Sequence, residues 1–224
     1  MLDYKLTRTK RKSIAMYIRD GFIEVRAPFF YSMSEINRFV VSREKWAVEK
    51  LAESKARIAK RESFRLAYGS EIAYRGKPYP ISGRQGDIAG FDVSGFYVPP
   101  DLTTEGIKRC CMKTYRLLAE RYLTDRTFDY ARRMSVKPAS IRVSNAKSRW
   151  GSCSAKKNVN FSWRLIMADD EVIDYVVVHE LAHLIEYNHS TRFWKIVGTY
   201  LPDYKERRAK LKVLHEKLGV EDWD

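Results

Sequence analysis

The chain of 224 residues has little cysteine, little histidine and no long apolar run. Its three cysteines include an adjacent pair, Cys110 and Cys111, and form no CxxC motif, which excludes a disulfide framework and a thiolate metal site. No apolar stretch approaches the roughly 20 residues that span a bilayer. The opening MLDYKLTRTKRKS carries closely spaced charges and lacks an apolar signal region. We therefore expect a cytoplasmic protein with reduced thiols and no membrane partner.

Charge and apolar content are both high. Apolar residues make up 45% of the chain, enough to bury a substantial core, and the formal net charge is +14. Residues 104–157 carry 14 basic and 4 acidic side chains, whereas residues 158–224 carry 9 basic and 12 acidic ones. Such an uneven excess suits an anionic partner such as nucleic acid, a nucleotide or an acidic peptide. It equally suits a solvated, solubilising surface, and the sequence leaves both interpretations open.

Residues 1–100 are expected to form a β-rich N-terminal region with one long helix. Strands are predicted within 5–11, 13–20 and 22–28, with Asp20-Gly21 as a hairpin turn. Ser32 and Glu35 have the spacing of a capping box, and apolar residues then recur at helical intervals to about Lys60. Residues 68–100 are punctuated by glycine and proline, which predicts short strands and turns.

Residues 101–224 are expected to form a second domain. Its first helix carries both adjacent cysteines on an apolar stripe, which indicates core packing. Strands are predicted within 139–163, and the helix that follows, from Glu171 to about Tyr187, is apolar on nearly every side and must be buried. Ser190 can cap another helix, and an amphipathic helix is predicted from Asp203 to Leu218. The predicted class is α+β, with a helical core beside a small, mainly antiparallel sheet.

The buried helix contains the motif HELAH. His179 and His183 are four residues apart, so their imidazoles lie on one helical face and can bind a single ion. Glu180 projects about 100° round from His179, where it can flank the ion without ligating it and act as general base for a bound water. His189 follows six residues after His183, just past the expected helix end, and can supply a third nitrogen. The pattern predicts a three-histidine zinc site with an open fourth position.

Other residues near the motif are candidates for substrate contacts or for orienting a ligand. In RWGSCS, residues 149–154, Gly151 suggests a bulge or a close approach of the backbone to another group. Arg149, Lys147 and Ser152 could line a cleft and hold an anionic or tetrahedral group, whereas the neighbouring Trp150 and Cys153 more simply fill the core. Glu186, one helical turn beyond His183, could orient a ligand imidazole or meet solvent.

These segments together resemble a known family. RWGSCS, the run DYVVVHELAHL at 174–184 and NHSxxFW at 188–194 are similar to YgjP-type zinc-dependent metallohydrolases, which are related in outline to SprT-like zincin domains. The opening RTKRKSIAMYIRDGFIEVRAP resembles the N-terminal strand region of that family. The resemblance implies a zincin-like helical core, His179, His183 and His189 as zinc ligands, and Glu180 as the catalytic carboxylate. It also implies that part of the family hydrolyses UTP to release pyrophosphate.

Three functions are consistent with the sequence. The first is a metallopeptidase in which Glu180 takes a proton from water and later delivers it to the leaving amine. The second is a nucleoside triphosphate (UTP) pyrophosphohydrolase that uses the same metal site, with Lys147 and Arg149 neutralising the phosphates. The third is a nucleic-acid-binding protein with an accessory zinc site, although a closed structural site normally has four protein ligands.

Overall fold

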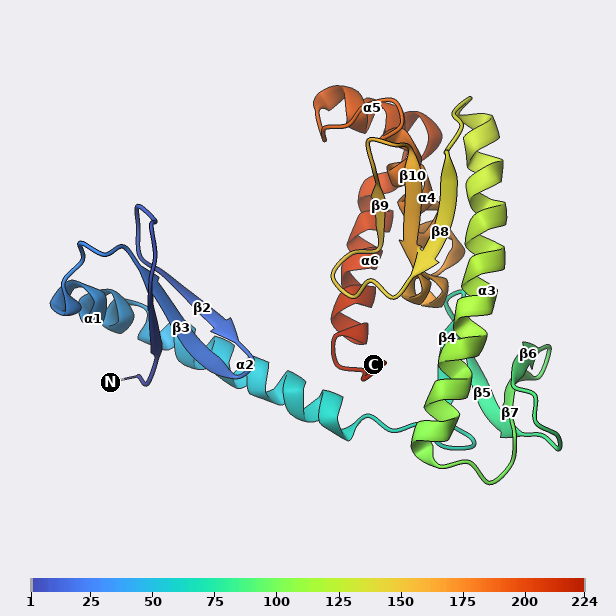
Figure 1. The fold of residues 1–224 in the computed structure, drawn as a ribbon, viewed down its shortest axis with the longest axis horizontal. Helices are drawn as coiled ribbons and strands as arrows, with labels where there is room; N and C mark the ends of the chain where they lie inside the picture. Colours follow the sequence, from blue (N-terminus) through green and yellow to red (C-terminus); the bar gives the residue numbers. More distant parts are fainter. Residues whose placement is uncertain (1, 224) are drawn as a thin grey trace. The chain divides into compact units, whose positions relative to one another are not determined.

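The computed structural model describes residues 2–223, whose contacts group the chain into two compact units, each of which is treated separately below (Figure 1). The first contains the chain up to Phe64 together with Lys217–Asp222, and the second contains Arg65–Glu216 and Trp223. This grouping differs from the division expected after residue 100. The glycine-rich segment joins the second unit because its strands pack on the following helix, as in the Phe96–Tyr115 ring contact at 4.8 Å.

In the first unit a three-stranded sheet covers the start of a helical segment. The strands β1 (Lys5–Arg8), β2 (Ala15–Arg19) and β3 (Phe22–Ala27) have the order β1-β3-β2, with β1 parallel and β2 antiparallel to β3. The β2–β3 turn is the predicted one, with positive φ at both Asp20 (48°) and Gly21 (76°). Alternate residues of β3 face a core that also contains Ile36, Val40 and Ala47.

The expected single helix from Ser32 to Lys60 is two helices. Helix α1 (Met33–Ser42) begins with the predicted Ser32–Glu35 capping box, and α2 (Glu44–Ser63) follows after Arg43. The break coincides with competing hydrogen bonds, because the Ser42 hydroxyl donates to Phe39 O (2.7 Å) and Arg43 N donates to Val40 O (3.1 Å). Both bonds tighten the turn in place of the regular helical pattern.

The second unit contains two further small sheets. Strands β4 (Glu71–Tyr74), β5 (Lys77–Gly83), β6 (Gly90–Asp92) and β7 (Gly95–Val98) have the order β4-β5-β7-β6. Strands β8 (Ser140–Ser144), β9 (Gly151–Cys153) and β10 (Asn158–Ser162) have the order β8-β10-β9. The α+β class is confirmed, but each of the three sheets is mixed: the second contains the parallel pair β5–β7 and the third the parallel pair β8–β10.

The helices of this unit surround the third sheet. They are α3 (Thr104–Arg133), the 3₁₀ helix η1 (Trp163–Met167), α4 (Asp170–Ala182), α5 (Thr191–Tyr200) and α6 (Tyr204–Leu218), of which the last two residues are grouped with the first unit. Figure 1 shows α3 running beside β8, and α3 also contacts α4 and η1. Cys111 on α3 is buried and Cys110 is half-buried, in agreement with the predicted apolar stripe. No helix among residues 2–223 is long and apolar enough to cross a membrane.

An ion-pair network joins α3 to α4. Arg126 donates two hydrogen bonds to Asp174, from Nε to Oδ1 (2.6 Å) and from Nη2 to Oδ2 (2.7 Å), and Tyr130 donates a third to Oδ2 (2.9 Å). The Asp174 side chain is only 9% exposed, so these bonds satisfy a carboxylate that would otherwise be costly to bury. The network fixes α4 against the long helix α3.

Candidate metal centre

The centre lies at the C-terminal end of α4. This helix is buried on most sides by its valines and isoleucine, and it carries His179 and Glu180 in its last turn. It ends at Ala182, five residues earlier than the sequence predicted, because Leu184 N and Ile185 N bond to carbonyls three residues back (both 3.0 Å). His183 is the C-cap and keeps an α-helical conformation, so its side chain still follows that of His179 on one face.

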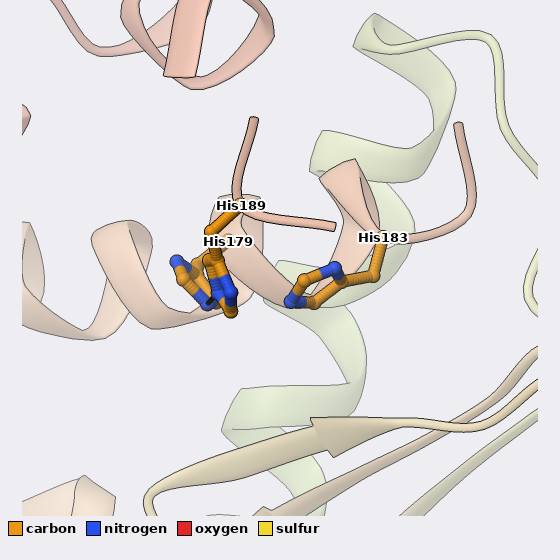
Figure 2. Close-up of side chains that lie close together, drawn as sticks. All are labelled: His179, His183 and His189. Atoms are coloured by element: carbon orange, nitrogen blue, oxygen red, sulfur yellow. Dashed lines mark hydrogen bonds between the residues drawn. The ribbon is translucent and has the colours of Figure 1, made fainter. Parts of the chain in front are cut away.

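Three imidazoles converge at this point. Figure 2 shows the His183 ring pointing toward the rings of His179 and His189, and one nitrogen of each lies within 4.8 Å of the others. The Nε2 atoms of His179 and His189 are 3.0 Å apart. The loop that follows α4 therefore returns His189 to the helix, as the spacing predicted.

A backbone carbonyl orients His183. Its Nδ1 lies 3.3 Å from Glu186 O, and donation of that proton leaves Nε2 as the free acceptor. The Glu186 carboxylate instead approaches Arg192, with Oε2 3.8 Å from Nε. Glu186 thus contacts the histidine through its main chain, while its side chain pairs with a cation. Among the described residues, the buried Nδ1 of His179 has no hydrogen-bond partner.

Aromatic rings of α5 pack against the imidazoles. Ser190 caps this helix by accepting from Phe193 N (3.3 Å), and the buried Phe193 ring lies 4.6–4.9 Å from all three histidine rings. Trp194 stacks on His189, with centroids 5.7 Å apart and planes at 30°. The rings of Phe193 and Trp194 therefore contact the imidazoles directly and restrict their movement.

Glu180 is buried against the edge strand β9. The residue is only 6% exposed, and a Cβ added to Gly151 would lie 2.6 Å from its Cγ and Oε1. The close approach of backbone that Gly151 suggested is therefore to this carboxylate. Burial raises the pKa of Glu180 to about 7, against the opposing effect of Arg149. A carboxyl group with this pKa can exchange a proton near neutral pH.

The segment before β9 brings one predicted cation close to Glu180. Arg149 and Lys147 are exposed in the loop 145–150, and Arg149 acts electrostatically on Glu180. Hydrogen bonds anchor this loop at its start, where Asn145 Oδ1 accepts from Trp163 Nε1 (2.8 Å), and at its end, where Ser162 N donates to Trp150 O (2.9 Å). The loop is therefore held in place on both sides of the arginine.

Strand alternation separates the remaining residues of this segment. Gly151 and Cys153 share the face toward Glu180, and both burial and Glu180 raise the pKa of the Cys153 thiol to about 11. Ser152 lies between them and is directed to the other face of the sheet, away from Glu180. Trp150 is half-buried rather than part of the core, and its ring meets that of the exposed His215 at 6.1 Å.

The donor set fits a divalent metal ion. With Zn–N bonds of about 2.0–2.1 Å, a tetrahedral ion separates neighbouring ligand atoms by about 3.3 Å. The Nε2 atoms of His179 and His189 are 3.0 Å apart, and one nitrogen of each of the three histidines lies within 4.8 Å of the others. Burial lowers the pKa of His179 to about 3 and also lowers that of His183, so both rings are neutral, the form that binds metals. Three nitrogens with an adjacent carboxylate leave a coordination position open.

Phe193 and Arg208 are two contributors that sequence reasoning missed. In the sequence, Phe193 stood out only as part of NHSxxFW, and Arg208, which acts electrostatically on His179, lay within the amphipathic helix predicted from Asp203 to Leu218. The sequence signal for Phe193 was its spacing in NHSxxFW. A helix that begins at Ser190 can bring the residue four positions after His189 back against that histidine. No local sequence pattern indicated that Arg208 would lie near the histidines.

Comparison with known proteins identifies a family for this chain. The profile of the family described as YgjP-like, metallopeptidase domain, matches residues 12–214, which include all three histidines and Glu180. The metallopeptidase zymogen abylysin of Pyrococcus abyssi is 20% identical, with a TM-score of 0.39 over 45% of this chain and 98% of that chain. The metallopeptidase zymogen jannalysin of Methanocaldococcus jannaschii is 20% identical, with a TM-score of 0.37 over 42% and 95%. No curated protein gives a significant match. Because the family profile extends over most of its length, the chain belongs to the YgjP-like metallopeptidase family.

Proposed function

We propose that this protein is a zinc metallopeptidase in which His179, His183 and His189 hold one zinc ion and Glu180 is the general base. One observation carries the proposal: a nearly buried carboxylate lies in the turn between two converging histidines and against the backbone of an edge strand. A carboxylate without a salt-bridge partner is costly to bury, and general-base catalysis at a metal gives a reason for it.

The proposed chemistry assigns the proton transfers to Glu180. If bound by His179, His183 and His189, a zinc ion would supply a Lewis acid and would lower the pKa of water at the site to about 7. Glu180 Oε accepts the proton of the attacking water and later delivers it to the nitrogen of the leaving amine. The raised pKa of Glu180 supports both transfers near neutral pH, because the protonated and ionised forms are then both accessible.

The edge of β9 supports an extended peptide as the substrate. Ser162 N donates to Trp150 O (2.9 Å), so the adjacent Gly151 directs its N–H and C=O away from β10. Because β9 is at the end of its sheet, a peptide could pair with it as a further strand. Gly151 touches Glu180, so this pairing would bring the scissile carbonyl beside the general base.

Arg149 is proposed to stabilise charge that develops during the reaction. Its loop is anchored at both ends, and its positive charge acts on Glu180. A guanidinium group can donate two hydrogen bonds to a tetrahedral oxyanion. Lys147 is exposed in the same loop and is proposed to contact the substrate more peripherally. Ser152 is directed to the other face, which weakens the case for its participation.

Turnover of zinc-loaded protein on unstructured polypeptides tests the proposal. Glu180→Gln should retain one zinc ion per chain and lose about 10²- to 10⁴-fold in kcat, because the proton acceptor is removed while the ligands remain. Glu120→Gln, on the exposed surface of α3, removes the same charge and should retain activity. Full peptide cleavage by Glu180→Gln would refute the mechanism.

UTP pyrophosphohydrolase activity is the second candidate. It is favoured by the basic loop 145–150, whose Lys147 and Arg149 could neutralise phosphates. The assay above therefore includes UTP as a parallel substrate, with pyrophosphate release as the signal. Release that depends on Glu180, without peptide cleavage, would replace the peptidase assignment by this one.

An accessory contact with nucleic acid is also proposed. Residues 6–13 contain four basic side chains and no acidic one, which supports an accessory contact with nucleic acid. Such binding should weaken steeply as the salt concentration rises, and affinity that does not change with salt would exclude it.

The three free cysteines support a reducing compartment such as the cytoplasm.

A further inference from the structure

Helix α6 brings an arginine close to the histidine centre. Tyr204 and Arg208 are one turn apart on this helix, and both contact Trp194 of α5. The Tyr204 ring stacks on Trp194 with centroids 5.3 Å apart and planes at 15°, and Arg208 Cζ lies 5.5 Å from the Trp194 centroid. The guanidinium group is thus supported by an aromatic platform, an arrangement that holds its planar fork in position.

That platform is shared with two of the histidines. Trp194 lies 5.7 Å from the His189 ring and 5.8 Å from the His179 ring, measured between centroids. One indole therefore separates the Arg208 guanidinium group from the proposed metal ligands.

Arg208 differs in its pairing from three nearby cations. Arg207 donates to Asp203 Oδ1 (2.9 Å), Lys210 pairs with Glu171, and Arg192 of α5 approaches Glu186 (3.8 Å). Within the described part of the chain, no carboxylate lies within the 4.0 Å salt-bridge distance of Arg208, which is exposed. An exposed guanidinium group without a counter-ion, held beside a hydrolytic centre, suits an anionic group of a substrate.

We propose that Arg208 is a specificity-determining residue that binds a carboxylate of the peptide substrate, beside the stacked rings of Trp194 and Tyr204. This inference rests on the proposed peptidase function and names the class of substrate: peptides with a carboxylate a short distance from the scissile bond. The carboxylate can be the C-terminal group of the peptide or an acidic side chain, since a guanidinium fork binds both in the same way.

Three matched peptides distinguish these sources. One has a free C-terminus, the second is its C-terminal amide, and the third is the amide with one glutamine replaced by glutamate. We measure kcat and KM with zinc-loaded wild-type protein, Arg208→Gln and Arg116→Gln, the last of which removes the same charge from an exposed position on α3. Binding of the same peptides to Glu180→Gln and to Glu180→Gln/Arg208→Gln is measured by titration calorimetry.

The expected result is a preference for one or both carboxylate peptides over the neutral amide. Arg208→Gln should lower kcat/KM by about 10- to 100-fold, mainly by raising KM, as expected for a lost charged hydrogen bond. This loss should occur for the carboxylate peptides alone. The same difference should appear in the calorimetric affinities, and Arg116→Gln should retain the preference. Arg208→Lys should recover part of it, because the charge remains and the bidentate geometry does not.

The results that would refute the role of Arg208 differ from the result that would refute the proposed function. Cleavage of all three peptides with equal efficiency, or an equal loss for all three in Arg208→Gln, would refute the role of Arg208 while retaining the peptidase. Absence of Glu180-dependent cleavage of any peptide would instead refute the proposed function. Equal affinities of the two Glu180→Gln proteins for the carboxylate peptides would then refute the binding role as well.

Discussion

Gly151 leaves room for Glu180: the space that a Cβ would occupy on this strand residue is taken by the carboxylate side chain, 2.6 Å away. Every other residue type would therefore displace either the edge strand or the proposed catalytic group. Glycine is required here because of this close contact with Glu180 and not because of backbone conformation, since Gly151 does not have a positive φ.

Gly151→Ala should consequently impair catalysis without removing the metal. A displacement of Glu180 by about 1 Å is expected to lower kcat by roughly 10²-fold, while the three histidines keep their positions. Zinc content by mass spectrometry and kcat on an unstructured polypeptide measure the two effects. Gly198→Ala on α5 is the control, since its Cβ would meet Tyr204 at an ordinary 3.7 Å. Equal activity of both variants would show that Glu180 tolerates displacement.

Metal removal should lower the thermal stability of the protein without unfolding it. A ligand present at 100 times its dissociation constant stabilises the folded state by about 2.7 kcal/mol, so chelation should lower Tm by several degrees. The buried valines of α4 and its contact with α3 do not depend on the metal, so circular dichroism at 25 °C should change little. His183→Ala should abolish the zinc-dependent rise in Tm. A metal-induced rise that persists in this variant would argue against the three-histidine site.

Asp174→Ala should destabilise the protein strongly. The variant leaves the Arg126 guanidinium group partly buried without its carboxylate, which typically costs about 3–5 kcal/mol. Urea unfolding followed by tryptophan fluorescence measures this loss. Asp129→Ala removes the exposed partner of Arg132 on the same helix and should cost less than about 1 kcal/mol. Similar losses in the two variants would mean that the α3–α4 network contributes little.

Asp170 should make stability depend on pH in the acidic range. Hydrogen bonds from Arg75 Nε (2.7 Å) and Tyr122 (2.9 Å) hold the pKa of this carboxyl below its usual value. Its folded pKa is therefore below the unfolded value of about 3.9, so the stabilisation is present above pH 4 and is lost as the pH falls through the folded pKa. Asp170→Asn should flatten the fall in Tm as the pH drops below about 4. An unchanged profile would assign that fall to other carboxylates.

The sequence predicted the parts of this site that depend on local geometry. HELAH places two histidines on one helical face whatever surrounds it, and the spacing to His189 requires a return of the chain. The fit of Gly151 against Glu180 depends on how β9 packs on α4, which is a long-range contact with no local pattern. Arg208 approaches from a helix that begins fifteen residues after His189, so only its amphipathic spacing was visible in the sequence.

Two element boundaries were missed for similar reasons. The end of α4 at Ala182 and the break at Arg43 both depend on one or two hydrogen bonds that compete with the regular helical pattern. Apolar periodicity continues through both points, so it predicts helix where the backbone has already turned. The grouping of β4–β7 with α3 likewise depends on aromatic packing between Phe96 and Tyr115.

The shortness of β9 has a consequence for the behaviour of the protein at high concentration. A sheet edge with unpaired backbone groups is a template for pairing with any extended chain, including another copy of the same protein. Three residues, with the anchored loop 145–150 on one side and a turn on the other, offer too few bonds for stable self-association. The molecule can therefore keep this edge accessible to a transient strand and still resist the edge-to-edge aggregation that a longer open strand would promote.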